Sequence, residues 1–242
     1  MAIDRDVSFT WYGHACFEAR TPRGQVILFD PWFGNPLSTR TADAVDRCDI
    51  MLVSHGHADH LGDALTIASR TRPFFPMIHE LSLYLGRSLP GGMDAVVGMN
   101  KGGTVERHGV RITMVHAEHS AGNWSDQNDT PLYLGEPVGF IVVLENDFTF
   151  YFAGDTDVFG DMRLIRDLYR PELAFLPIGG HYTMDPRTAA LAVEMLGVND
   201  VVPMHWGTFP AFSGTPGQLR DELAKRSVQA TVHEMKPGGT LR

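Results

Sequence analysis

The chain contains 242 residues, of which 43% are hydrophobic and 20% are charged, and its formal net charge at pH 7 is -9. This length suits one large domain or two small ones, and we expect a single domain over residues 1–242. The negative charge argues against a nucleic-acid partner or an anionic membrane surface. A small anionic substrate stays compatible with it, because bound cations can reverse the local field.

Two features concern the cellular compartment. Cys16 and Cys48 are too few for a disulfide framework, which fits a reducing compartment. The first six residues lack the apolar stretch of a signal peptide, and the longest apolar run, Val138–Leu144, is too short to span a membrane. We therefore expect a soluble cytoplasmic protein without a membrane partner.

Strands and loops, with fewer helices, follow one another along the chain. β-Branched, aromatic or aliphatic runs between turn residues predict strands at Val7–Tyr12, Cys16–Ala19, Val26–Phe29, Ile50–Val53, Val110–Val115, Val138–Leu144, Phe148–Phe152, Leu173–Leu176 and Val201–Val202. Helices are predicted at Leu61–Ser69, His79–Arg87, Met162–Tyr169, Pro186–Leu196 and Pro216–Arg226. Asp185 and Thr215 are the expected N-caps of the last two. The pattern predicts sheets packed on each other with helices outside.

A His-Gly-His-Ala-Asp-His sequence begins at His55, directly after the strand predicted at Ile50–Val53. Neither a buried strand nor a solvated turn calls for three imidazoles around a carboxylate, whereas zinc selects these ligands. His55 and His57 can share one face of an extended segment, while Asp59 and His60 point differently and could serve a second ion. A His-rich surface turn is the other interpretation, but such tracts lack the strand and helix around this one.

Three further candidate ligands each follow a predicted strand. They are His119, Asp155 and His205. Loops at strand ends carry chemistry because a rigid sheet fixes their positions. Together with the segment from His55 to His60, these residues predict a metal site.

The motifs, taken in order, resemble those of the metallo-β-lactamase superfamily, and the similarity spans nearly the whole chain. They are Phe29-Asp30-Pro31-Trp32, His55-x-His57-x-Asp59-His60, His119-Ser120, Gly154-Asp155-Thr156 and Pro203-Met204-His205. Finer features are similar to a cytoplasmic branch of metal-dependent hydrolases close to the L-ascorbate-6-phosphate lactonases. These features are Tyr12-Gly13-His14, Leu176-Pro177-Ile178-Gly179-Gly180, Tyr182-Thr183-Met184 and His205-Trp206-Gly207-Thr208-Phe209-Pro210.

The resemblance implies an α/β (α+β) fold, a four-layer αββα sandwich with two divalent metal ions at one edge. Zinc is the preferred metal, with manganese, iron or nickel as alternatives. The implied ligands are His55, His57 and His119 for the first ion, Asp59, His60 and His205 for the second, and Asp155 as the bridge.

Two neighbours of these ligands need separate interpretation. Asp30 is expected to order the ligand loop rather than to bind metal, since ligand imidazoles need such partners. Both His116 and His119 lie in the third ligand segment. We prefer His119 because the family pattern places a serine after the ligand.

The function implied is that of a metal-dependent hydrolase that uses metal-bound hydroxide on a small ester, lactone or phosphoester. Asp59 would help to orient the hydroxide, and His181 or His14 would assist the leaving group. His181 could equally be a buried packing residue, and His14 could lie at the surface. Cys16 is expected to face inward, so we predict no protein nucleophile.

Other functions stay open at this stage. The same ligands can hold a diiron centre in an oxidoreductase, although that scaffold usually carries an appended flavin or rubredoxin domain, which we do not find in this chain. A glyoxalase-like thioesterase is a further alternative, while intact ligands argue against a catalytically silent sensor. The sequence fixes neither the substrate nor the oligomeric state, and a homo-oligomer stays open.

Several other residues receive an interpretation from sequence context. We expect His79, His108 and His233 at the surface. Trp206 and Phe209 are expected to line a pocket wall, with core packing as the alternative. The polar segment Ala121–Glu136 is long for a loop and is expected to act as a lid or binding loop.

Overall fold

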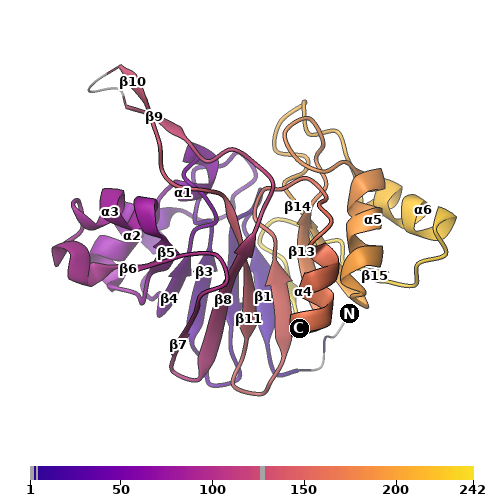
Figure 1. The fold of residues 1–242 in the computed structure, drawn as a ribbon, viewed down its shortest axis with the longest axis horizontal. Coiled ribbons are helices and arrows are strands. Elements are labelled where there is room, and N and C mark those ends of the chain that lie inside the picture. Colours follow the sequence, from indigo (N-terminus) through magenta and orange to yellow (C-terminus); the bar gives the residue numbers. More distant parts are fainter. Residues whose placement is uncertain (1–2, 4, 126–128) are drawn as a thin grey trace.

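Two β-sheets lie face to face in the computed structural model of the protein, which describes residues 3, 5–125 and 129–242 (Figure 1). In spatial order, the first sheet contains β16 (Thr240–Leu241), β1 (Ser8–Trp11), β2 (Phe17–Arg20), β3 (Val26–Phe29) and β4 (Ile50–Leu52). The second contains β15 (Thr231–Val232), β14 (Asp200–Met204), β13 (Leu173–Pro177), β12 (Thr149–Phe152), β11 (Val138–Val143), β8 (Val110–His116) and β7 (Thr104–Arg107). Helices lie outside both sheets, which confirms the predicted αββα sandwich.

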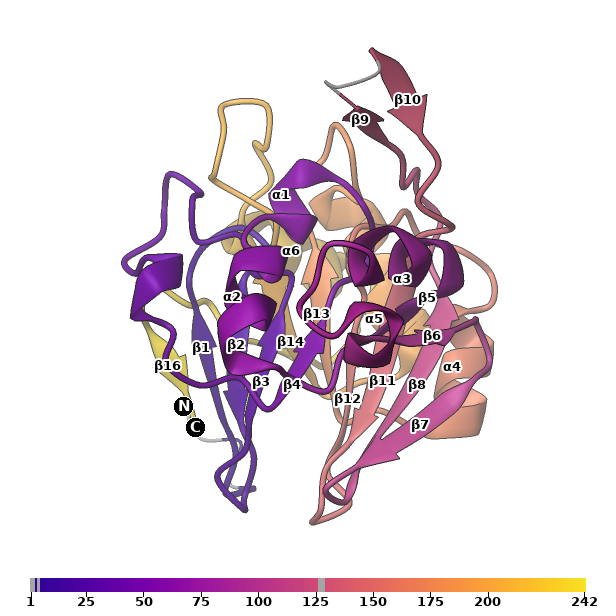
Figure 2. The ribbon, with the colours of Figure 1, turned by 90° about the vertical axis from the view of Figure 1, so that its left-hand side faces the viewer.

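The two ends of the described chain share the first sheet. β16 pairs antiparallel with β1, and Leu241 lies opposite Phe9. Figure 2 shows β16 beside β1 at the edge of the first sheet. The pairing of the first strand with the last favours a single domain.

The helices form two groups on opposite sides of the paired sheets (Figure 1). One group contains α1 (Ala58–Leu61), α2 (Ala64–Thr71) and α3 (His79–Gly86), with the parallel pair β5 (Pro76–Ile78) and β6 (Val97–Met99) and the 3-10 turns Ala42–Ala44 and Gly92–Ala95. The other contains α4 (Met162–Tyr169), α5 (Pro186–Leu196) and α6 (Pro216–Lys225). Within the described ranges, none of the helices is both long and apolar enough to cross a membrane.

Both predicted N-caps are confirmed. The Asp185 side chain accepts a hydrogen bond from the backbone N–H of Thr188 at the start of α5. At the start of α6, the Thr215 side chain accepts a hydrogen bond from the backbone N–H of Gln218, and the Gln218 side chain accepts one from the backbone N–H of Thr215. Such caps satisfy backbone N–H groups that the helix itself leaves without partners.

Aromatic side chains fill the space between the two sheets. The rings of Phe9 and Phe17 in the first sheet each lie 5.0 Å from that of Phe175 in β13, and Phe29 lies 4.7 Å from Phe152 in β12. All five are fully buried. Buried aromatic pairs contribute large apolar areas and specific ring contacts, so they hold the sheets in one relative position.

One predicted helix differs in the structure. In place of a helix at Leu61–Ser69, α1 starts at Ala58 and a break at Gly62 separates it from α2. Gly62 has a φ of 37°, and a Cβ atom there would lie 2.6 Å from the Cα atom of Trp32. A larger residue would therefore clash with the loop after β3.

Most of the elements that the sequence did not predict are short strands. They are β5, β6, β7, β9 (Asn123–Ser125), β10 (Thr130–Leu132), β15 and β16. Runs of two to four residues are too short to show the alternation that marks a strand. The loop predicted at Ala121–Glu136 contains the β9–β10 hairpin, which projects from the body of the molecule in Figure 1, and residues 126–128 of this loop lie outside the described residues.

Replacing Phe175 by alanine should destabilise the fold by about 3–5 kcal/mol, the usual cost of deleting a buried phenylalanine ring. Leu168 on α4 is 70% exposed and provides a matched control, because Leu168→Ala should change stability by less than about 0.5 kcal/mol. Denaturant unfolding followed by circular dichroism measures both changes. Equal stability of the two variants would contradict the role given to the aromatic core.

Candidate metal centre

The predicted metal ligands meet at one edge of the sandwich. β12, β13 and β14 run parallel, and β8 runs in the direction of β12 because both are antiparallel to β11. Their carboxyl ends therefore share one edge, where His119, Asp155 and His205 follow β8, β12 and β14. His55 follows β4 of the other sheet, so both sheets contribute ligands.

His55, His57 and His119 form the first group of candidate ligands. One ligand atom of each lies within 4.8 Å of those of the other two, and His55 Nε2 lies 2.9 Å from His57 Nδ1. The other ring nitrogen of His57 lies 3.3 Å from Ser120 Oγ. The structure thus brings together the three residues predicted for the first ion.

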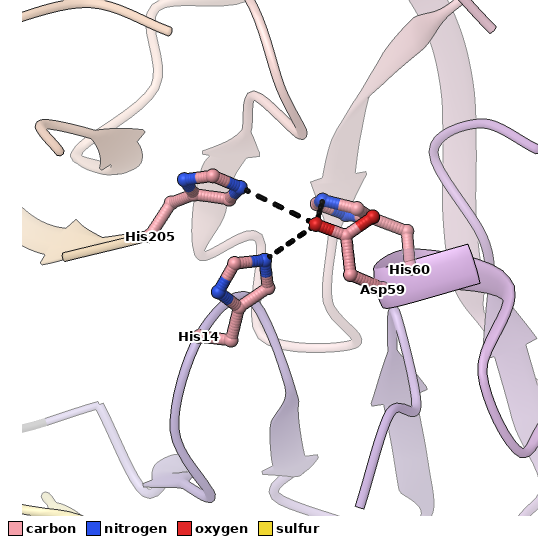
Figure 3. A group of neighbouring side chains, drawn as sticks. All are labelled: His14, Asp59, His60 and His205. Carbon is pink, nitrogen blue, oxygen red and sulfur yellow. Dashed lines mark hydrogen bonds and ion pairs between the residues drawn. The ribbon is translucent and has the colours of Figure 1, made fainter. Parts of the chain in front are cut away.

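Asp59, His60 and His205 form the second group, and His14 joins them (Figure 3). One ligand atom of each again lies within 4.8 Å of the others. The Nε2 atoms of His60 and His205 are each 3.9 Å from Asp59 Oδ2, and His14 Nε2 is 3.0 Å from the same oxygen. Because Asp59 and His60 lie on α1, the start of this short helix positions half of the group.

Asp155 lies between the two groups. Its Oδ2 atom is 3.6 Å from His119 Nε2, and it is 3.2 Å and 3.0 Å from the Nε2 atoms of His60 and His205. His55, His60 and Asp155 also form a cluster of their own. One carboxylate thus reaches members of both groups, as a bridging ligand must.

Hydrogen bonds to Asp30 fix the protonation of two histidines. The Ser54 hydroxyl donates to Asp30 Oδ2 at 2.7 Å, so it accepts from His55 Nδ1 at 2.9 Å. His60 Nδ1 donates to the same carboxylate oxygen at 2.7 Å. In both rings Nε2 therefore keeps its lone pair for a metal when the ring is neutral. These contacts agree with the ordering role predicted for Asp30.

Burial keeps several imidazoles of the site neutral. It lowers the pKa of His55 well below the usual histidine range, and it also lowers the pKa of His57 and His119. The pKa of His14 falls to about 4 for the same reason. Neutral imidazole is the form that binds metal ions.

Neighbouring side chains shift the pKa values of the other groups at the site. Burial by itself would raise the pKa of Asp155. His205 and His60 lower this pKa by a larger amount, so that it lies well below its usual value. Burial would also raise the pKa of Asp59, but the hydrogen bond with His14, together with the neighbouring His60, outweighs this effect and lowers the pKa. Burial lowers the pKa of His60, but Asp155 and Asp30 raise it well above the usual value. A proton on His60 thus offsets these carboxylates, and a bound cation would take over that role.

Buried polar atoms without hydrogen-bond partners show that a metal fits this site. Within the described part of the chain, they include His205 Nδ1 and Asp155 Oδ1. The Nε2 atoms of His60 and His205 also lack hydrogen bonds of good geometry and have only their ion-pair contacts with Asp155. Each unsatisfied buried group costs about 1–3 kcal/mol. A divalent cation with nitrogen and oxygen ligands would satisfy these atoms together, so the donor set suits such an ion.

The backbone around the site has unusual torsion angles. His14, Asp30 and His205 have φ values of 54°, 40° and 55°, in the left-handed region that residues other than glycine rarely adopt. Strained residues of this kind concentrate at functional sites, where the surrounding structure holds them. Between His55 and His57, a Cβ atom on Gly56 would lie 2.7 Å from the carbonyl oxygen of Ala121, so the ligand loop packs tightly under the projecting hairpin.

His116, the rival of His119, and His181, a predicted catalytic residue, belong to none of the ligand clusters among the described residues. His116 lies within 3.2 Å of Lys101 Nζ and 3.3 Å of a Glu118 carboxylate oxygen. This geometry favours His119 over its rival. His181 is exposed, which argues against a buried packing role, and its ring lies 4.3 Å from that of Tyr182.

The other interpreted residues have mixed outcomes. His79 and His108 are exposed as predicted, but the surface position predicted for His233 is wrong, because His233 is buried and lies 2.6 Å from Asp200 Oδ1. Trp206 stacks on Trp11 at 5.5 Å, which favours the core interpretation.

Sequence reasoning missed two residues that hold ligand-site imidazoles. Ser54 contacts His55, and Thr208 Oγ1 lies 3.0 Å from His14 Nδ1. Thr208 lies three residues after His205 in the motif that ends at Pro210, but hydroxyl residues near a metal ligand are too common for the sequence to single one out.

Comparisons with known proteins agree with this geometry. Residues 25–206 match the family model described as the beta-lactamase superfamily domain. A UPF0173 metal-dependent hydrolase from Koribacter versatilis is 46% identical over 235 residues, covering 97% of each chain. Another from Roseiflexus castenholzii is 42% identical over 243 residues, covering 99% of this chain and 98% of the relative.

The solved structure of a metallo hydrolase from Ignicoccus hospitalis is also similar, with a TM-score of 0.84 and 36% identity over 97% of each chain. The identity and coverage of these relatives exceed what a shared fold alone would give. The chain belongs to the metallo-β-lactamase superfamily and, within it, to the UPF0173 family of metal-dependent hydrolases.

Proposed function

We propose that the protein is a hydrolase with a dinuclear metal site, most simply a dizinc site. His55, His57 and His119 would hold one ion, and Asp59, His60 and His205 the other. The observation that carries this proposal is the position of Asp155, whose Oδ2 atom lies within 3.6 Å of ligand atoms from both groups. Manganese, iron or nickel also suit this nitrogen and oxygen donor set.

The substrate proposed is a small ester, lactone or phosphoester, including the sugar-phosphate lactones that the finer sequence resemblance suggests. Bound cations would supply a water that ionises near neutral pH and positive charge for the developing oxyanion. Asp59, whose side chain is 33% exposed, can accept a hydrogen bond from that water and orient it. Cys16 is fully buried, so it offers no nucleophile to a substrate.

We assign to His181 the transfer of a proton to the leaving oxygen. Its exposed ring can exchange protons with solvent, as a general acid must between turnovers. His14 suits this task less well, because it is completely buried and both of its ring nitrogens already have partners. No contact among the described residues favours a diiron oxidoreductase or a thioesterase, so these alternative functions stay predictions. The cytoplasmic location and a homo-oligomer also stay predictions.

Metal analysis tests the ligand assignment. The wild-type protein purified without chelator should contain close to two metal equivalents, and His119→Ala should lose metal because an ion loses a ligand. His116→Ala is the matched control, since His116 contacts Lys101 and Glu118 instead, and it should keep both metals. Elemental analysis after dialysis measures the content. Equal loss in both variants, or a wild-type value near zero after reconstitution, would refute the assignment.

Thiol reactivity tests the absence of a cysteine nucleophile. Burial raises the pKa of both Cys16 and Cys48, which are free and buried, so neither should form a thiolate at neutral pH. A chromogenic disulfide reagent should label neither residue in the native protein and both after denaturation. Rapid labelling of one native thiol together with loss of hydrolysis would indicate covalent catalysis instead.

Substitution of His181 tests the proposed general acid. On a substrate chosen from a lactone, phosphodiester and thioester panel, His181→Ala should lower kcat by about 10²–10⁴-fold while both metals stay bound. His108→Ala, an exposed histidine in the turn between β7 and β8, is the matched control and should leave kcat unchanged. Unchanged turnover in the His181 variant would remove this residue from the mechanism.

A further inference from the structure

Three buried histidines at the site share one arrangement of their rings. In each, Nδ1 lies within 3.0 Å of a side-chain oxygen from another residue, and Nε2 lies within 3.2 Å of another candidate ligand. Metal-binding histidines usually have such a partner on the nitrogen that does not bind the ion. The pairs are His55 with Ser54, His60 with Asp30, and His14 with Thr208.

The Nε2 atom of His14 already lies at a distance suited to a shared ion. Zinc ligands bind at about 2.0–2.2 Å, so tetrahedral ligand atoms lie about 3.4 Å apart. His14 Nε2 is 3.0 Å from Asp59 Oδ2, and a ring nitrogen of His14 lies within 4.8 Å of one in His60 and one in His205. Figure 3 shows His14, Asp59, His60 and His205 turned toward one another from three parts of the chain.

The backbone holds His14 in this position. Its carbonyl oxygen accepts hydrogen bonds from the backbone N–H of His205 at 3.1 Å and from Trp11 Nε1 at 2.9 Å. Its φ of 54° is strained for a histidine, so the surrounding contacts must impose it. His14 and His205 are therefore fixed to each other through both their backbones and their rings.

We propose that His14 is a direct ligand of the second metal ion, together with Asp59, His60 and His205. This inference rests on the dinuclear site of the proposed function. It gives the second ion three imidazoles, the same number as the first, and such a nitrogen-rich shell favours zinc, iron or nickel over magnesium or calcium. The rival role is that of a positioning residue, in which His14 Nε2–H donates to the Asp59 carboxylate.

Two substitutions separate the roles. In His14→Gln, the side-chain amide can still donate to Asp59 but is a poor zinc ligand, whereas His14→Ala removes both functions. If His14 is a ligand, both variants should keep one zinc equivalent and bind the second more than about 100-fold more weakly, beyond the 10–100-fold typical of lost outer partners. Thr208→Val, which removes the partner of Nδ1, should weaken the second zinc by about 10–100-fold.

Zinc competition titrations measure these affinities, and cobalt(II) provides a second readout, because its visible bands respond to a lost ligand. His108→Gln is the matched control and should bind two equivalents like the wild type. Recovery of the second zinc in His14→Gln, but not in His14→Ala, would overturn the ligand role in favour of positioning.

A measurement on the wild-type protein covers the case in which the variants fail to fold. In ¹⁵N-labelled protein loaded with cadmium-113, His14 Nε2 should show coupling to the metal and carry no proton. A protonated Nε2 without coupling would overturn the inference while leaving the dinuclear site intact. A wild-type protein that binds no second metal would instead refute the proposed function, and this inference with it.

Discussion

The desolvation of the ligand cluster is the constraint on which the site depends. His60, His205 and Asp155 are almost completely buried, and polar atoms of each lack hydrogen-bond partners within the described residues. Removing an ion from water costs several kcal/mol even after the protein relaxes. Hydrogen bonding cannot offset this cost, because His60 already uses Nδ1 on Asp30 and keeps its free nitrogen toward another ligand. Only a positive charge, from a proton or a metal ion, completes the arrangement.

The aromatic core fixes the positions of the strands that carry these buried ligands. Because Phe175 contacts rings of the opposite sheet, the carboxyl ends of the strands cannot shift relative to each other without opening the core. Ligands that follow these strands are therefore placed by packing that lies well away from them in sequence. The same logic applies to α1, where the close contact of Gly62 with Trp32 ends the helix just after Asp59 and His60. Rigid elements place ligands more accurately than loops alone could.

The sequence predicted the parts of the structure that depend on local pattern. The longer strands, the capped helices and the ligand motif all show in residue type and spacing, and each proposed metal ligand lies in a ligand cluster. What it could not predict depends on contacts between distant residues. Strands of two to four residues exist because a neighbour pairs with them, as β16 does with β1. His233 is buried where the fold places it 2.6 Å from Asp200 Oδ1, and Thr208 matters only because the fold brings it to His14.

The ligand set joins the two sheets, and this links metal binding to folding. His14 and His55 come from loops of the first sheet, while His119, Asp155 and His205 follow strands of the second. The unfolded chain cannot hold these side chains together, so a cation that binds them stabilises the native state by an amount that grows with its concentration. Without the cation, the raised pKa of His60 favours a proton on this ring beside Asp155 and Asp30. A cation bound at this centre would thus also act as a cross-link at the edge of the sandwich.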